Sequence, residues 1–340
     1  MSTAQPPTTT PVYPDRSTRL MLFGVLQVLL GCICGLMAVM MVVFSSLGPM
    51  PKTPQGPAMN AQMMIPGMVF YFLLAVALIW LGIGLIRARR WAWTLTIVLS
   101  WMWLVIGVVS FVSFLFVAGP MMSASIAQQG KIPPEAIMAM RIVSGAVLAC
   151  IYILLPAVFL VFCHHEAGRA TCQRRDPKIP WTDRCPMPVL VLSILMALSV
   201  VSMFSVLAYG CVMPLFGVFI SGAAGAVVVL LMALVMAYLA WGTYRLQMAA
   251  WWGTLLLWIA GTVNMAVTFS QAGLMEMYEK MGMPAAQLEM MRKSGVVETM
   301  SHWGPWMGIL GGIAWLGYLL YVRRYFVRSG EATTGTPRNE

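Results

Sequence analysis

Eight long apolar runs divide this chain, and they constrain its fold more than any other feature. A helix needs about 20 apolar residues to cross the hydrocarbon core of a membrane, and a crossing segment must satisfy its own backbone hydrogen bonds. The sequence therefore predicts an all-α integral membrane protein with eight transmembrane helices. The eight runs are Leu20 to Phe44, Met64 to Ile86, Trp93 to Ala118, Ile142 to Phe162, Val189 to Tyr209, Gly222 to Gly242, Ala250 to Ser270 and Trp303 to Val322.

The composition agrees with this class. Only 9% of the 340 residues are charged and 60% are hydrophobic, whereas about 25% of the residues of soluble domains are charged. The net charge of +10 comes from short basic blocks beside the apolar runs. Such blocks set the orientation of a membrane protein, so we expect a lipid bilayer and no nucleic acid as the partner.

The fifth and sixth runs have no charge between them, because Cys185 to Tyr244 is one uncharged stretch of 60 residues. As a single helix this stretch would be about 90 Å long, which is about three hydrocarbon cores. It must therefore turn back on itself. Gly210, Pro214 and Gly217 mark the turn, because glycine and proline interrupt regular helices.

With eight crossings both termini lie on one side of the membrane, and the basic residues predict which side. The segments on the side of the termini hold 15 lysines and arginines, and the opposite loops hold six. Because basic residues accumulate in cytoplasmic segments, we expect both termini in the cytoplasm. The membrane is then a plasma membrane, which we expect to be a bacterial inner membrane.

Short motifs recur in the two halves of the chain. Gly84-Leu-Ile-Arg87 followed by Ala92-Trp93 returns as Gly242-Thr-Tyr-Arg245 followed by Ala250-Trp251, at a constant offset of 158 residues. This predicts two tandem four-helix repeats related by an axis along the membrane normal. The expected organisation is a disordered cytoplasmic tail (1–18), a first repeat (19–163), a cytoplasmic connector (164–188), a second repeat (189–326) and a disordered cytoplasmic tail (327–340).

The connector carries residues that could bind a metal, but their spacing argues against it. It lacks the paired C-x2-C that makes a zinc site recognisable, so we expect a solvated loop near the membrane and no metal. We expect Trp181 at the level of the lipid headgroups and Asp183 in an ion pair with an arginine. The metal-competent residues are Cys163, His164, His165, Cys172 and Cys185.

The eight runs contain no Asp, Glu, Lys, Arg or His apart from their ends. Ion-coupled transporters place such groups at membrane depth, and enzymes need them as acids, bases or ligands. We therefore predict no catalytic residue and no cofactor. The leading interpretation is a non-enzymatic membrane component that assembles with itself or with other membrane proteins. The alternative is a carrier or channel for a neutral or apolar solute, with a path between the repeats and Gln27 and Asn264 as polar contacts.

Methionine is concentrated in the loops expected outside the cell. Ser45 to Met63, Gly119 to Arg141 and Gln271 to His302 hold 14 of the 31 methionines in 74 of the 340 residues. Thioethers are soft ligands that select Cu(I), so a second alternative is Cu(I) binding. The candidate ligands are Met275, Met277, Met281, Met283, Met290 and Met291. The competing interpretation is that methionine serves as an adaptable hydrophobe in short interfacial helices.

Small residues lie on one face of the first and last runs. Gly31 and Gly35 are spaced by four residues, and so are Gly304, Gly308 and Gly312. Such faces let helix backbones approach closely. They predict packing within the fold, with a homodimer interface as the second possibility.

Overall fold

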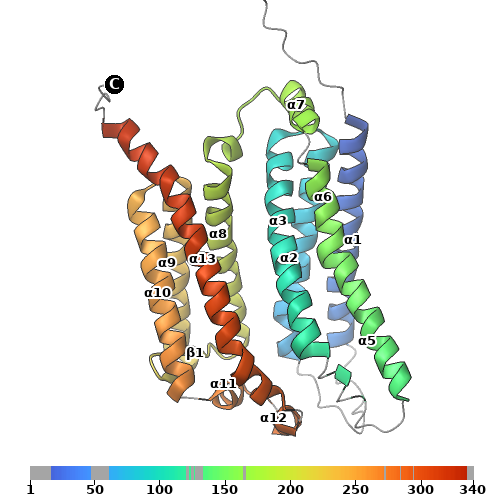
Figure 1. Cartoon of the computed structure of the whole chain (residues 1–340), viewed down its shortest axis with the longest axis vertical. Coiled ribbons are helices and arrows are strands. Elements are labelled where there is room, and N and C mark those ends of the chain that lie inside the picture. Colours follow the sequence, from blue (N-terminus) through green and yellow to red (C-terminus); the bar gives the residue numbers. More distant parts are fainter. Residues whose placement is uncertain are drawn as a thin grey trace, which may run out of the picture.

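Two helical bundles lie side by side in the structure, which is a computed structural model (Figure 1). It describes residues 17–46, 61–119, 122–123, 126, 133–163, 166–271, 273–283, 285–293 and 295–334. Residues 1–16 and 335–340 of the two expected tails lie outside this range.

The first bundle contains the helices of the first half of the chain. Its elements are α1 (Ser17–Ser46), α2 (Ala61–Ile86), α3 (Arg90–Ser113), the π-helix η1 (Phe114–Ala118), α5 (Pro134–Ala149), the π-helix η2 (Cys150–Leu154) and α6 (Leu155–Cys163). Glycines bring α1 and α2 together, because a Cβ on Gly24 would lie 2.8 Å from the carbonyl oxygen of Gly82. A Cβ on Gly82 would in turn lie 2.7 Å from the carbonyl oxygen of Gly24. Only glycine permits this approach.

The connector and the second bundle follow. Their elements are α7 (Glu166–Arg175), the 3₁₀-helix η3 (Trp181–Arg184), α8 (Met187–Ala208), β1 (Met213–Leu215), β2 (Val218–Ile220), α9 (Gly222–Tyr244), α10 (Met248–Gln271), α11 (Leu274–Lys280), α12 (Ala285–Lys293) and α13 (Val296–Thr334). In Figure 1, α7 and both described ends of the chain lie at one end of the molecule. We name this the connector end, and the end that holds β1, α11 and α12 the hairpin end.

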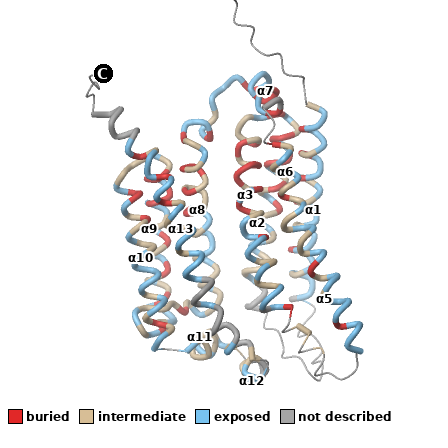
Figure 2. The backbone as a smooth tube through the Cα atoms, in the orientation of Figure 1, coloured by how far each residue is buried: buried red, intermediate tan, exposed pale blue. Residues whose placement is uncertain are grey.

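Seven helical segments are long and apolar enough to cross a membrane. They coincide with the first seven predicted runs, which supports an all-α membrane protein. Exposed residues occur along all the helices (Figure 2). Many of them are apolar; Val161 is 77% exposed and Leu234 is 68% exposed. A bilayer is the solvent that accommodates such a surface, because it imposes no hydrophobic penalty on it. α13 is not among the seven, although it runs from the hairpin end to the connector end in Figure 1.

The predicted turn between the fifth and sixth runs is present, but it is a β-hairpin. β1 and β2 pair antiparallel, with Leu215 opposite Val218. The two loop residues, Phe216 and Gly217, have φ angles of 41° and 98°. Positive φ at both positions is the type I′ geometry that fits a two-residue hairpin. The strictly all-α expectation is thus corrected by one short sheet.

One apolar core joins the two bundles. Val98 and Met102 of α3 pack in the same buried cluster as Val189 and Leu192 of α8. Trp251 of α10, with 1% of its surface exposed, belongs to this cluster too. The halves therefore share a core at the connector end, where these residues lie.

Two segments are more helical than the sequence indicated. The expected solvated connector contains α7, and residues 327–334 of the expected disordered tail continue α13. α7 has no apolar period that would have predicted a helix. Arg174 and Arg175 in its last turn stabilise it through the helix dipole.

Candidate functional site

The connector is fixed to both bundles through buried cysteines. Cys172 of α7 packs against Leu20 and Leu85 of the first bundle, in a cluster completed by Ala88. Cys185, which follows η3, belongs to the core shared with α8 and α13. The connector therefore packs against both halves and is not a free loop. We call this packed segment, residues 166–187, the clamp.

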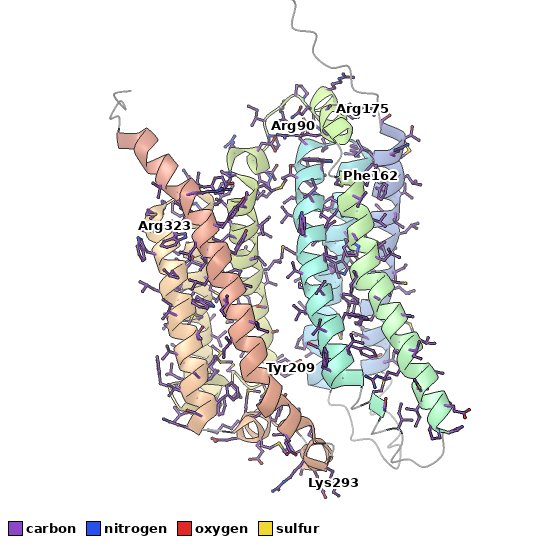
Figure 3. The ribbon with its side chains drawn as sticks, viewed as in Figure 1. Arg90, Phe162, Arg175, Tyr209, Lys293 and Arg323 are labelled. Carbon is purple, nitrogen blue, oxygen red and sulfur yellow. The ribbon has the colours of Figure 1, made fainter. Side chains whose placement is uncertain are left out.

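Ion pairs reinforce the clamp on the side of the first bundle. Arg90 Nη2 lies 2.7 Å from Asp183 Oδ2, and these side chains are only 18% and 24% exposed. Arg89 Nη1 lies 3.6 Å from Asp176 Oδ1. The predicted pairing of Asp183 with an arginine is thus confirmed. Figure 3 shows Arg90 and Arg175 together at the connector end.

Trp181 ties η3 to the second bundle. Its ring meets the ring of Tyr244 edge to face, with centroids 6.3 Å apart. The Tyr244 hydroxyl donates a hydrogen bond of 2.9 Å to the carbonyl oxygen of Trp181. Trp181 remains 43% exposed.

A cavity of about 740 Å³ lies between these elements. Its walls come from the first turn of α3, from α7 and from the segment that runs through η3 into α8. The lining residues are Arg90, Trp93, Thr94, Arg169, Cys172, Gln173, Ile179, Thr182, Asp183, Arg184, Cys185, Pro186 and Met187.

Positive charge predominates in the lining of this cavity. Three arginines and one aspartate contribute side chains. Asp183 already accepts from Arg90 at 2.7 Å and from the Thr182 hydroxyl at 3.3 Å. Arg169 and Arg184 have no ion-pair partner among the residues that the structure describes. The cavity thus offers two guanidinium groups for which the described residues supply no counter-charge.

The two thiols of the cavity are held in the neutral form. Burial raises the pKa of Cys172 to about 12, and the Asp176 carboxylate acts in the same direction, while Arg175 and Arg90 oppose them. Burial raises the pKa of Cys185 to about 11. Thiolates are the form that reacts and binds metals, so neither thiol is poised for such chemistry at neutral pH.

Of the other metal-competent residues of the connector, the structure describes only Cys163. Cys163 is buried at the end of α6, and His164 and His165 lie outside the described residues. Within the described ranges, no group of three or more His, Cys, Asp or Glu residues is placed to hold a metal.

Gln27 and Asn264, the predicted polar contacts of a solute path, are both engaged inside their own halves. Gln27 is buried and accepts a long hydrogen bond of 3.5 Å from the Thr96 hydroxyl. The Asn264 amide accepts from the Phe216 backbone N–H at 2.6 Å and donates to the Pro214 carbonyl at 2.9 Å. The role of Asn264 is to hold the hairpin on α10.

Two of the candidate copper ligands serve in apolar packing. Met277 and Met281 lie against buried Val212 and Phe219 of the hairpin region. Both methionines thus act as adaptable hydrophobic residues. Met50, Met59 and Met121 of the methionine-rich loops lie outside the described residues.

The two glycine faces differ in their surroundings. On α1, a Cβ at Gly31 would lie 3.1 Å from the Ala75 carbonyl oxygen of α2. On α13, a Cβ at Gly304 or Gly308 would have no neighbour within 4 Å in the described part of the chain, and one at Gly312 would lie 3.2 Å from the Trp258 ring. The α1 face is used within the fold, and most of the α13 face is open.

The sequence did not indicate the cavity or the two arginines that line it without a partner. Arg169 and Arg184 look like any other basic residue near an apolar run, and only the folding of α7 against α3 brings them together. Comparison with known protein families, with curated proteins and with solved structures finds no match to this chain.

Proposed function

We propose that this protein is a non-enzymatic membrane component that assembles with itself or with other membrane proteins through α13. The open glycine face of α13 carries the proposal. Gly304 and Gly308 of this face, and Gly311 beside them, are exposed, and a Cβ on each would meet no atom of the described residues within 4 Å. Association of helices in lipid depends on small residues that let backbones approach closely, and α1 and α2 already use glycines in this way.

A cross-linking experiment in native membranes tests this proposal. The wild type should give cross-linked dimers or larger complexes, and the variant Gly304→Leu/Gly308→Leu should give mostly monomers, because two leucines prevent close approach. Gly261→Leu on α10 is the matched control, since a Cβ at Gly261 also has no neighbour within 4 Å. Monomers alone in the wild type, or unchanged complexes in the double variant, would contradict assembly through α13.

We further propose that the chain is a tandem repeat. The turn after α2 and the turn after α9 support this, because their backbone conformations and hydrogen bonds correspond at the offset of 158 residues. Ala88 and Leu246 have φ angles of 49° and 58°. The N–H of Arg89 donates to the Gly84 carbonyl at 2.9 Å, and the N–H of Gln247 donates to the Gly242 carbonyl at 2.9 Å.

An identical glycine contact closes both turns. A Cβ on Gly84 would lie 2.5 Å from the Ala92 Cβ, and one on Gly242 would lie 2.7 Å from the Ala250 Cβ. Positive φ is uncommon for residues other than glycine, so its recurrence at two equivalent positions, with the same hydrogen bonds, favours duplication over coincidence.

We propose α13 as the eighth crossing. Its 39 residues would extend about 58 Å, well beyond the hydrocarbon thickness of about 30 Å. An eighth crossing would keep both termini on one side, and the excess of basic residues in the segments at that end favours the cytoplasm of a bacterial cell. The carrier and copper alternatives rank lower, because Asn264 holds the hairpin and Met277 packs in an apolar cluster.

A further inference from the structure

The cavity at the connector has a surplus of positive charge at the edge of an apolar helical bundle. We propose that it binds the phosphate group of an acidic phospholipid. This site lies at the junction of the two halves and is independent of the assembly through α13.

Two arginines in the lining of the cavity favour an anion. Arg90 is neutralised by Asp183 at 2.7 Å, which leaves Arg169 and Arg184 as the two lining cations without an ion-pair partner among the described residues. Guanidinium groups bind phosphate oxygens through charge-assisted hydrogen bonds and can do so in a bidentate manner. A phosphate has enough oxygens to accept hydrogen bonds from both side chains.

The N-terminal ends of two helices at the cavity also favour an anion. α3 begins at Arg90 and α8 begins at Met187, and both residues line the cavity. Neither helix has a side chain that caps its first turn. The positive end of a helix dipole favours an anion, and so do the first amide groups of the helix. α3 offers both, whereas α8 offers its dipole and fewer amides, because Pro188 in its first turn has no N–H.

The apolar side chains beside the charges favour a lipid as the source of the phosphate. Ile179 is 68% exposed and Met187 is 37% exposed, and both line the same cavity. A soluble anion would leave these apolar side chains exposed to water, whereas the glycerol and acyl parts of a lipid would cover them. Basic pockets beside transmembrane helices are known to hold acidic headgroups.

A lipid titration tests the proposal. The purified full chain is titrated with phosphatidylglycerol or phosphatidylcholine in a neutral detergent, and bound lipid is counted by native mass spectrometry. We expect one saturable site for phosphatidylglycerol, with an affinity at least about tenfold above that for phosphatidylcholine. The variant Arg169→Gln/Arg184→Gln should weaken this binding about 10- to 100-fold, because each charged hydrogen bond contributes about a factor of ten at the lower end of its range.

The matched control removes the same charge elsewhere at the connector end. Arg245 and Arg323 stack on Trp241 and Trp251, at 5.2 and 5.3 Å from the ring centroids, and do not line the cavity. The variant Arg245→Gln/Arg323→Gln should therefore keep its phosphatidylglycerol affinity within about threefold. Without added lipid, the Arg169→Gln/Arg184→Gln variant should melt at the temperature of the wild type, so its loss of binding is not due to misfolding. The control variant should melt slightly lower, because it loses two cation–π contacts.

The outcomes separate the possible sources of the anion. If inorganic phosphate at millimolar concentration displaces the lipid from the wild type, the anion site is supported and accepts soluble phosphate as well. If wild-type protein does not distinguish the two lipids, the proposal is wrong. Equal losses in the two double variants would also overturn it, because they would show general attraction of a basic surface for anionic lipid.

Discussion

Removing the ion pair between Arg90 and Asp183 should weaken the attachment of the connector to the first bundle. The two atoms are 2.7 Å apart, and the side chains are 18% and 24% exposed. Exposed pairs contribute about 0–1 kcal/mol, and breaking a fully buried pair costs about 3–5 kcal/mol. For this partly buried pair we expect a coupling free energy of about 1–2 kcal/mol, since a charged hydrogen bond is about twice as strong as a neutral one.

A double-mutant cycle measures this coupling. The free energies of unfolding of Arg90→Ala, Asp183→Ala and the double variant are compared with that of the wild type in mixed micelles with increasing SDS. All proteins in the cycle keep Cys172 and Cys185 as their only cysteines, and a thiol-reactive fluorophore then reports unfolding, because both thiols are buried in the native protein.

The pair of Lys293 and Glu289 on α12 is the matched control. Its two atoms are also 2.7 Å apart, but its side chains are 72% and 65% exposed. Its coupling should be far smaller than that of Arg90 and Asp183, because solvent screens it. Equal coupling in the two cycles, or none between Arg90 and Asp183, would refute the view that partial burial makes the connector a clamp.

Two further predictions concern packing and the buried thiols. Gly107→Ala should lower the free energy of unfolding by about 1–3 kcal/mol, because a Cβ there would collide with the carbonyl oxygen of Tyr152 in η2. Gly261→Ala, which has open space, should be neutral or slightly stabilising, and a loss as large as that of Gly107→Ala would contradict this. Because burial raises the pKa of Cys172 to about 12, its thiolate fraction at pH 8 should be on the order of a thousandfold below that of a free thiol. Its alkylation should accordingly be that much slower in the native protein and should accelerate as the pH rises; native alkylation as fast as in SDS would refute the expectation.

Hydropathy was sufficient to predict the helices that carry most of this fold. Run length alone located seven of them, because lipid allows few alternatives to a helix. The split of the 60-residue uncharged stretch followed from length and from Gly210 and Gly217, which adopt positive φ angles of 73° and 98° in the turn. That the turn is a β-hairpin held by Asn264 could not be predicted, since the contact joins α10 to a loop 48 residues earlier.

The candidate site was much less predictable. The sequence indicated that Asp183 would meet an arginine, but its partner lies 93 residues away in α3, and several arginines were equally plausible. α7 carries no apolar period, and it is the docking of Cys172 into the first bundle that fixes its position. The cavity results from this docking. The sequence alone therefore could not predict that Arg169 and Arg184 line one cavity.

The most direct test of the account is the location of the two termini relative to the membrane. Reporter domains fused to the N-terminus and to the C-terminus should both be found in the cytoplasm, and an impermeant maleimide should label Cys211, which lies near the hairpin, only from the outside. Seven crossings would separate the termini, whereas eight would keep them together. If the two reporters lie in opposite compartments, α13 does not cross the membrane, and the tandem repeat of two four-helix units is wrong.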